Sequence, residues 1–236
     1  MNLVEVKVWG DYACFTRPEN KVERVSYDVM TPSAARGVLE GILWKPRMCY
    51  RVREIAVLNP IRRASILRNE INTVQSARAA QSWQKSGGGY ASDQDRAQRH
   101  ALVLRDVAYV IRAEIQLTAL ADADEMPQKY LAMFNRRVEH GQSYRQPYLG
   151  TREFSASFAP PEPTDTPIEH SDELGRMLLD IAFTPRKKGS MTYRTHDSTG
   201  SQLTDGQATP IFFRARLENG VMRIPAEEYA RLEGVK

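Results

Sequence analysis

The sequence predicts an α+β fold in which two helices and four strands form one domain, followed by a small β-rich appendage. Two observations lead to this prediction. Apolar and polar residues alternate at the N-terminus, and a long segment near the middle of the chain is rich in β-branched and aromatic residues, as strands are. Two other segments begin with proline and place apolar residues three and four positions apart, which is typical of amphipathic helices.

The first strand and the first helix lie close together in the sequence. Residues 3–9 alternate with period two and predict a strand. Thr31 is a suitable cap for a helix that begins at Pro32. Gly37 and Gly41 lie four positions apart on this helix, which indicates close approach of another backbone. The apolar stripe of the helix consists of Ala34, Ala35, Val38, Leu39 and Ile42.

Two strands and one uncertain segment occupy the middle of the chain. Residues 48–58 form an apolar-rich run, and residues 99–118 form a long β-branched and aromatic run, so both are predicted strands. Between them, residues 66–83 are predicted to hold a short helix. Residues 85–95 contain three consecutive glycines and predict a flexible loop, of a length that is usually functional or disordered.

The second helix and the fourth strand complete the domain. Residues 128–140 are predicted to be helical, with Pro127 at the start and Gly141 at the end. Residues 151–158 predict a strand. The order strand, helix, strand, strand, helix, strand is that of a ferredoxin-like βαββαβ domain, the architecture that RNA-recognition (RRM-like) modules also use. We place this domain at residues 1–158.

Residues 159–236 are predicted to form the C-terminal β-sheet and hairpin appendage. Residues 177–184 predict a strand, whereas residues 187–206 are polar and predict no element. Asn219-Gly220 is the strongest short hairpin signal in the chain. The hairpin is predicted to join residues 211–217 to residues 221–224.

The charge balance is compatible with an anionic partner but does not require one. The chain has 33 Lys and Arg against 29 Asp and Glu, a net charge of +4. Arginines recur between Arg47 and Arg105, where acids are few; one basic face and an ordinary solvated surface explain this equally well. The N-terminus lacks signal-peptide features, and no stretch approaches the roughly 20 apolar residues of a membrane span. We therefore expect a cytoplasmic protein that does not bind membranes.

Metal and cofactor chemistry has little support in the sequence. The histidines show no ligand spacing, and Cys14 and Cys49 alone cannot form a metal cage. The acidic residues Asp122, Asp124 and Glu125 are better explained as a solvated turn before a helix N-terminus. We therefore expect no metal and no cofactor. RNA carries its own nucleophile, the 2′-hydroxyl, so Lys, Tyr and His side chains suffice to cleave it.

Six short blocks occur in the order that one known family shows. The blocks are Trp9-Gly10-Asp11-Tyr12-Ala13, Trp44-Lys45-Pro46, Asn59-Pro60-Ile61-Arg62, Arg105-Asp106-Val107-Ala108-Tyr109, Phe134-Asn135-Arg136-Arg137 and Pro147-Tyr148-Leu149-Gly150-Thr151-Arg152-Glu153-Phe154. Together they resemble the CRISPR-associated Cas-five proteins of subtype I-C (Dvulg), which belong to the RAMP superfamily.

The resemblance implies a metal-independent endoribonuclease that cuts precursor CRISPR RNA at the repeat hairpin and leaves a cyclic phosphate. It also implies that the protein stays bound to the 5′ handle, so that its partners are CRISPR repeat RNA and the other subunits of the type I-C surveillance complex. Two alternatives remain open. One is a non-catalytic subunit that caps the handle and supports assembly, and the other is a general binder with affinity for duplex DNA.

The resemblance also points to catalytic residues. The position of the family's catalytic tyrosine is Leu43 here, and the family's Lys-His pair matches Lys129 and Tyr130. This implies that Lys129 stabilises the phosphate and that Tyr130 orients the 2′-hydroxyl or accepts its proton. Tyr50 is a candidate for the missing ring. Tyrosine is a poor base near neutral pH, because its unperturbed pKa is about 10.

Six further residues are candidate RNA contacts, namely Arg36, Trp44, Lys45, Arg136, Arg137 and Arg152. Each has a structural alternative. A tryptophan such as Trp44 more often covers a core than stacks on a base. Arg136 and Arg137 could pair with Glu139 or Glu125, and Arg152 could pair with Glu153.

Overall fold

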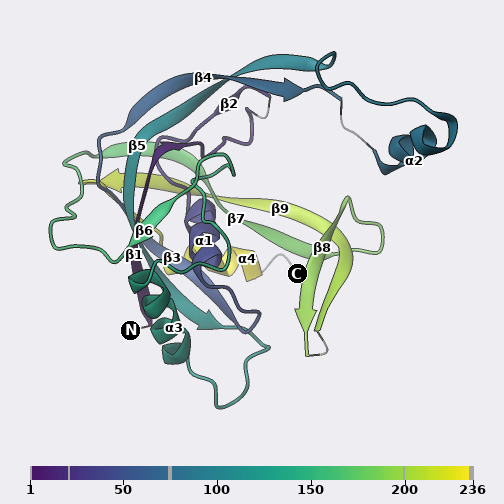
Figure 1. The fold of residues 1–236 in the computed structure, drawn as a ribbon. Helices are drawn as coiled ribbons and strands as arrows, with labels where there is room; N and C mark the ends of the chain where they lie inside the picture. The colour runs from purple at the N-terminus through teal and green to yellow at the C-terminus, as the bar shows by residue number, and fades with distance from the viewer. Residues whose placement is uncertain (1, 21, 74–75, 199, 234–236) are drawn as a thin grey trace.

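The computed structural model describes residues 2–20, 22–73, 76–198 and 200–233, and a large β-sheet forms its centre (Figure 1). Four strands occupy one end of the sheet in the order β6-β1-β5-β3, and every neighbouring pair is antiparallel. These strands are β1 (Leu3–Ala13), β3 (Met48–Val57), β5 (Arg96–Leu117) and β6 (Ser157–Ala159).

Two helices connect these strands as the sequence predicts. Helix α1 (Pro32–Ile42) lies between β1 and β3 in the chain, and helix α3 (Pro127–Glu139) lies between β5 and β6. The Thr31 side chain accepts a hydrogen bond from the Ala34 amide and so caps α1. With the strand order fourth, first, third, second, this connectivity is that of the ferredoxin-like domain, and the predicted fold class is confirmed.

The two faces of this sheet differ in chemistry. On one face, the even-numbered valines of β1 are fully buried beneath α1 and α3, with apolar residues of all these elements in one core. On the other face, Arg112 of β5 donates to Glu5 at 2.6 Å and to Glu54 at 2.6 Å. The period-two alternation of the strands therefore separates an apolar, helix-covered face from a charged one.

The C-terminal part of the chain continues the same sheet. Strand β10 (Val221–Arg223) pairs with β3, and β9 (Gly200–Glu218) and β7 (Asp172–Pro185) follow in that order. Asn219 and Gly220 both have positive φ angles, so the predicted hairpin between β9 and β10 is confirmed. The proposed division after residue 158 falls within β6 and stays a prediction. Two short elements, η1 (Ala226–Tyr229) and α4 (Ala230–Glu233), end the described chain.

The polar segment 187–206 contains a strand that the sequence did not predict. Strand β8 (Met191–Asp197) pairs with the first residues of β9, and the resulting β8–β9 hairpin turns away from the sheet (Figure 1). None of the described residues of β8 is fully buried. A strand without a buried face shows no apolar alternation, and this is why its sequence gave no signal.

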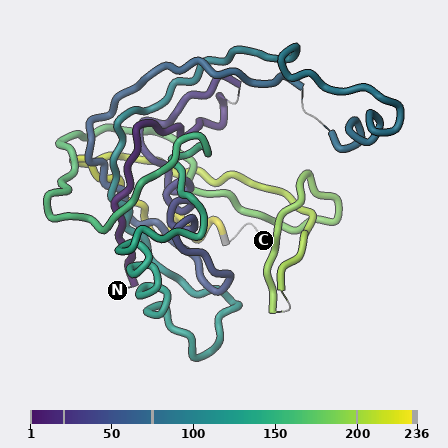
Figure 2. The backbone as a smooth tube through the Cα atoms, in the orientation of Figure 1, coloured from purple at the N-terminus to yellow at the C-terminus, as the bar shows by residue number. Residues whose placement is uncertain are grey.

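A second hairpin forms a long arm. Strand β4 (Arg62–Ile71) pairs with the first half of β5, and helix α2 (Ala77–Ser86) lies near the tip (Figures 1 and 2). Strand β2 (Arg24–Val25) pairs with β5 from the other side. The prediction of a helix within residues 66–83 is wrong for the part that belongs to β4 and correct from Ala77 onward; residues 74–75 lie outside the described residues. Residues 87–95 form the predicted loop.

The predicted strand at residues 151–158 is much shorter than expected. Only Ser157 and the two residues after it form β6, because the Leu149 amide donates to the Phe154 carbonyl at 2.7 Å and closes a tight turn. Gly150 has a φ of +87°, and a Cβ atom there would lie 2.0 Å from the Cys14 carbonyl oxygen. The turn is therefore pressed against the backbone that follows β1.

The two glycines of α1 do not behave alike. A Cβ atom on Gly41 would lie 3.4 Å from Pro147, and the Gly41 carbonyl accepts from the Tyr144 amide, whereas Gly37 has no close neighbour. The predicted close approach is confirmed at Gly41 only. No helix in the described ranges has the length and apolar character that a membrane crossing requires.

Candidate functional site

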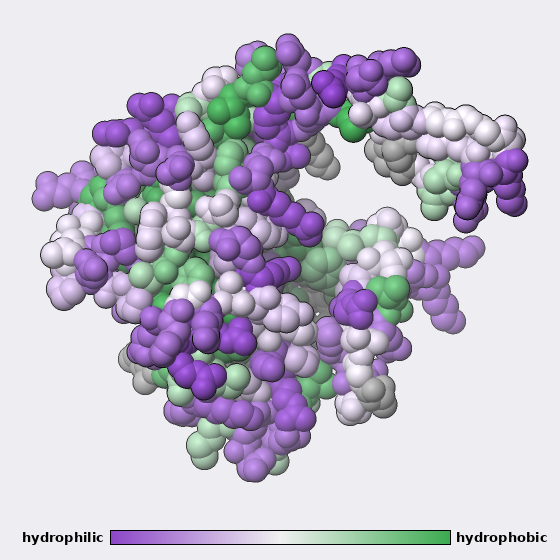
Figure 3. All heavy atoms as spheres, in the orientation of Figure 1, coloured by the Kyte–Doolittle hydropathy of each residue, from purple (hydrophilic) through white to green (hydrophobic). Residues whose placement is uncertain are grey.

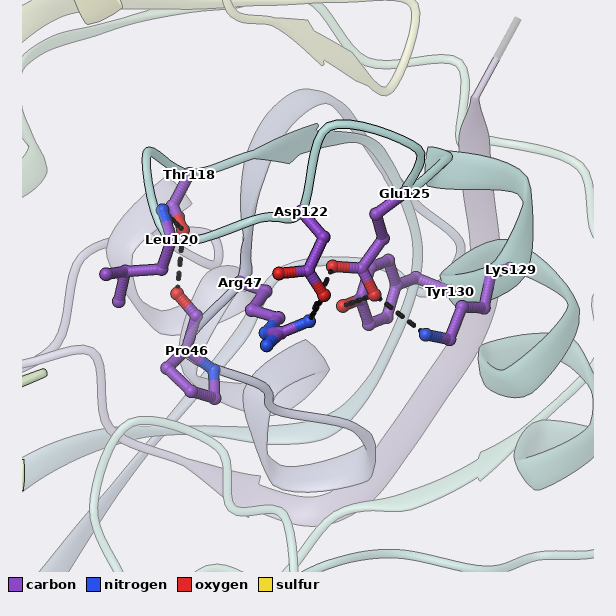
Figure 4. A network of polar contacts seen from close by, with 8 residues as sticks. All are labelled: Pro46, Arg47, Thr118, Leu120, Asp122, Glu125, Lys129 and Tyr130. Carbon is purple, nitrogen blue, oxygen red and sulfur yellow. Dashed lines mark hydrogen bonds and ion pairs between the residues drawn. The ribbon is translucent and has the colours of Figure 1, made fainter. Parts of the chain in front are cut away.

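Glu125 lies at the centre of a polar network at the start of α3 (Figure 4). Its Oε1 accepts hydrogen bonds from Lys129 Nζ and from the Tyr130 hydroxyl, both at 2.7 Å. A guanidinium nitrogen of Arg47 lies 3.4 Å from its Oε2 and also bonds Asp122. One carboxylate thus holds two cationic side chains and a phenol that come from two separate parts of the chain.

Local structure explains why these groups meet. Glu125 lies two residues before Pro127, the first residue of α3, and Lys129 lies in the first turn of that helix. Side chains four positions apart lie close together at such a helix start, and these two form an ion pair. The Thr118 hydroxyl donates to the Pro46 carbonyl at 2.8 Å. This bond fixes the end of β5 beside the segment that carries Arg47, as Figure 4 shows.

The network sets the protonation of its members. The side chain of Glu125 is only 4% exposed, yet hydrogen bonds from Lys129 and Tyr130 lower its pKa to about 2. Burial, followed by the hydrogen bond to Glu125, raises the pKa of Tyr130 to about 12. Near neutral pH, Glu125 is therefore ionised and Tyr130 keeps its proton.

Exposure separates the two predicted catalytic residues of α3. The Lys129 side chain is 61% exposed, so its ammonium group can contact a phosphate. Tyr130 is 3% exposed, and its hydroxyl proton is directed at Glu125. The geometry thus presents a cation to solvent and places the phenol behind it.

Tyr50 lies in the interior. It is 1% exposed, and its hydroxyl donates to the Leu43 carbonyl at 2.9 Å. Burial raises its pKa above the ordinary value. Arg137 donates to the neighbouring Ile42 carbonyl at 2.5 Å, so both side chains hold the C-terminal end of α1.

Arg36 is part of a nearly buried ion-pair cluster. Its guanidinium donates to both carboxylate oxygens of Asp180, at 2.8 and 2.7 Å, and to Glu40 at 2.6 Å. The Asp180 side chain is 7% exposed. These bonds join α1 to β7, and each of the three guanidinium nitrogens of Arg36 already has a carboxylate partner.

The remaining predicted RNA contacts lie nearer the surface. Trp44 is half-buried, and its ring centroid lies 4.9 Å from that of His196 on β8, with the planes tilted by 55°. Lys45, Arg136 and Arg152 are exposed.

The ion pairs considered from the sequence for three of these arginines do not form within the described ranges. Arg137 bonds a backbone carbonyl, and Glu153 pairs with Arg24 and Arg68 instead of Arg152. The structure therefore brings together Lys129 and Tyr130, and it places Trp44 and Lys45 in the segment that leads to Arg47. Arg36 lies apart, at β7.

Sequence reasoning missed the roles of Glu125, Arg47 and His196. The four-residue spacing between Glu125 and Lys129 was a usable signal, whereas Arg47 and His196 reach the site only through tertiary contacts. In the part of the chain that the structure describes, no three His, Cys, Asp or Glu side chains come together as metal ligands would.

Comparisons with known proteins agree with the sequence blocks. The profile of the family described as CRISPR-associated protein (Cas_Cas5) matches residues 3–225. A protein of Thermus thermophilus named CRISPR pre-crRNA endoribonuclease Cas5d is 44% identical over 98% of this chain and 95% of its own length. The protein of the same name from Mannheimia succiniciproducens is 42% identical over 98% of this chain and 99% of its own length.

Two solved structures share the fold. A functionally uncharacterized protein from Streptococcus mutans superposes with a TM-score of 0.61 at 20% identity, covering 95% of this chain and 93% of that chain. A structure described as a CRISPR-associated protein superposes with a TM-score of 0.59 at 22% identity, covering 95% of this chain and 92% of that chain. At these identities the likeness establishes the architecture alone.

Proposed function

The chain belongs to the CRISPR-associated Cas5 family, and on that basis we propose that it is an endoribonuclease that processes precursor CRISPR RNA. The observation that carries this function is the near full-length identity of 44% and 42% to two relatives that are named for the activity. After cleavage the protein stays on the 5′ handle as a subunit of the type I-C interference complex, in the cytoplasm, where the precursor RNA is made.

The reaction uses the RNA as its own nucleophile. The 2′-hydroxyl gives its proton to water and its oxygen attacks the adjacent phosphorus. The bond between phosphorus and the 5′-oxygen breaks as the 2′,3′-cyclic phosphate forms, and the departing 5′-oxygen takes a proton from water. Negative charge builds up on the phosphate oxygens in the transition state. The exposed Lys129 ammonium supplies the compensating charge, so no step depends on a metal ion.

Tyr130 and Glu125 position this lysine. Since the Tyr130 hydroxyl donates to Glu125 and has a pKa of about 12, it is unsuited to accept a proton near neutral pH. Its role in our proposal is to hold Glu125, which in turn holds Lys129 and Arg47. Tyr50 is buried, and its hydroxyl donates to the Leu43 carbonyl, so in this proposal it stabilises the end of α1 and does not contact the RNA.

The exposed candidates form the RNA-binding surface. Lys45, Arg136 and Arg152 offer cationic groups to the phosphate backbone, and Trp44 offers part of a ring. Arg137 donates to the Ile42 carbonyl and so stabilises the end of α1 beside this surface. Arg36 joins α1 to β7 through Asp180. Such cations also attract duplex DNA, with an affinity that falls as salt increases.

A second candidate function is supported by the same geometry. The hydroxyl groups of Tyr50 and Tyr130 are both occupied by internal hydrogen bonds, so Lys129 is the exposed member of the three predicted catalytic residues. A subunit that caps the handle without cutting it would show this arrangement.

One experiment separates the two functions. Purified protein is incubated in excess EDTA with labelled repeat RNA, and in parallel with the same RNA carrying a 2′-deoxy nucleotide at the cut site. The endoribonuclease cuts the first RNA to a cyclic phosphate and leaves the second intact. Binding of both RNAs without cleavage of either would establish the capping function instead.

A further inference from the structure

The β8–β9 hairpin contacts the segment that follows α1. Figure 3 shows open solvent between this hairpin and the arm formed by β4, α2 and the first half of β5. The contact is made by His196, whose ring centroid lies 4.9 Å from that of Trp44, two residues beyond the end of α1. Both rings are only half-buried, so each keeps part of its surface accessible.

Strand register shows which side chains accompany His196. Arg194 and His196 are two positions apart on β8, so they point to the same side of the hairpin. Arg194 is exposed and donates to Ser201, which pairs with His196 across the hairpin. A guanidinium has five N–H donors, so Arg194 retains donors for a ligand. The side of the hairpin that carries His196 therefore offers a ring and a cation together.

This site adjoins the proposed active site. Trp44, Lys45 and Arg47 belong to one short segment, and three residue steps span at most roughly 11 Å. At one end of that segment Trp44 meets His196, and at the other end Arg47 lies 3.4 Å from Glu125, which holds Lys129. A single RNA strand on Lys129 can follow this segment to the two rings.

We propose that Trp44 and His196 form a platform that binds one unpaired RNA base near the cut site, with Arg194 and Lys45 contacting the phosphates beside that base. The inference rests on the proposed function, because it concerns how the same RNA is held. Aromatic faces flanked by cations are the usual means by which proteins bind single-stranded nucleic acid. The platform selects RNA in which this nucleotide is unstacked and free.

Binding measurements test the platform without the complication of cleavage. The probe is fluorescent repeat RNA with a 2′-deoxy nucleotide at the cut site, and the readout is the dissociation constant from anisotropy. We expect His196→Ala to weaken binding about tenfold, the usual effect of losing one base–ring contact. Thr192→Ala is the matched control, since Thr192 is exposed on the same side of β8, and it should bind like the wild type.

A set of RNAs with single abasic positions near the cut site distinguishes stacking from a purely structural role of His196. In the wild type, one abasic position should weaken binding about tenfold. With His196→Ala that same position should have no further effect, because the base has lost its partner. His196→Phe should restore both the affinity and the sensitivity to this position.

The two proposals fail in different ways. Normal binding by His196→Ala, or additive losses for every abasic position, would overturn the platform while leaving an enzyme that cuts repeat RNA. Failure of the wild-type protein to bind or cut repeat RNA would overturn the proposed function itself.

Discussion

Two clusters of the molecule use the same groups in different surroundings. In the cluster of Arg36 with Glu40 and Asp180, the cation is turned inward and joins α1 to β7. In the cluster of Lys129 with Glu125, the carboxylate is covered and the cation is turned outward.

This difference assigns opposite roles to residues that looked alike in the sequence. A cation whose three nitrogens all bond covered carboxylates contributes to folding, because removing it leaves a buried charge. A cation that donates one bond to a covered carboxylate has donors left for a phosphate. Both clusters contain a covered carboxylate, so the exposure of the cation determines whether the cluster stabilises the fold or can bind a phosphate.

The largest expected effect is on catalysis. Lys129→Ala should slow single-turnover cleavage in EDTA by about 10²–10³, since it removes one charge from the transition state. Its free energy of unfolding should fall by only about 0.5 kcal/mol, because the ammonium group is exposed and Glu125 keeps its contacts with Tyr130 and Arg47. Lys188→Ala, another exposed lysine, is the control. A normal cleavage rate for Lys129→Ala would remove the catalytic assignment.

The cluster of Arg36, Glu40 and Asp180 should respond in stability instead. Arg36→Ala leaves Asp180 buried without its partner, which costs about 3 kcal/mol and lowers the melting temperature by roughly 6–12 °C. Cleavage per folded molecule should not change. The apolar pair Arg36→Met with Asp180→Leu should recover most of the loss in calorimetry. An unchanged melting temperature together with weaker RNA binding would reverse the roles of the two clusters.

Tyr130→Phe should have a smaller effect than Lys129→Ala. It removes the hydrogen bond to Glu125 and loosens Lys129, which should slow cleavage by about tenfold, the loss typical of a bond to a charged group. The pH–rate profile should keep its shape, because Tyr130 is not the base. A loss as large as that of Lys129→Ala, together with an altered profile, would make Tyr130 the proton acceptor.

The smallest effect concerns acid stability. The pKa of Glu125 is about 2 in the folded protein against an ordinary value of 4.5, so its contribution to stability is complete above pH 4.5 and is lost as the pH falls toward 2. The difference in melting temperature between the wild type and Glu125→Gln should therefore shrink as the pH falls from 6 to 3. A constant difference would mean that Glu125 is not stabilised as a carboxylate.

The buried elements were predictable from the sequence, and the exposed ones were not. One face is buried in each of the elements β1, α1, β3, β5 and α3. The spacing of their apolar residues therefore predicts whether each is a helix or a strand, and most of its length. β4 and β8 have no fully buried residue, and their positions depend on hydrogen bonds to β5 and β9. Nothing local in their sequences could report such pairing.

The candidate site follows the same rule. The resemblance and the position of the helix start predicted Lys129 as a catalytic residue. The burial of Tyr50 and the carboxylate partners of Arg36 could not be predicted from the sequence. Asp180 lies 144 positions from Arg36 in the chain, and His196 approaches Trp44 only through the β8–β9 hairpin. Contacts of this kind depend on the folded topology rather than on local spacing.

One strand, β5, serves two parts of the molecule. Its first half pairs with β4 in the arm, and its second half lies between β1 and β3 in the centre of the sheet. No linker separates the two halves, and Asp106, with a φ of 53°, marks the change between them. The arm is therefore an extension of the central sheet, and the backbone of one uninterrupted strand around Asp106 sets its direction relative to that sheet.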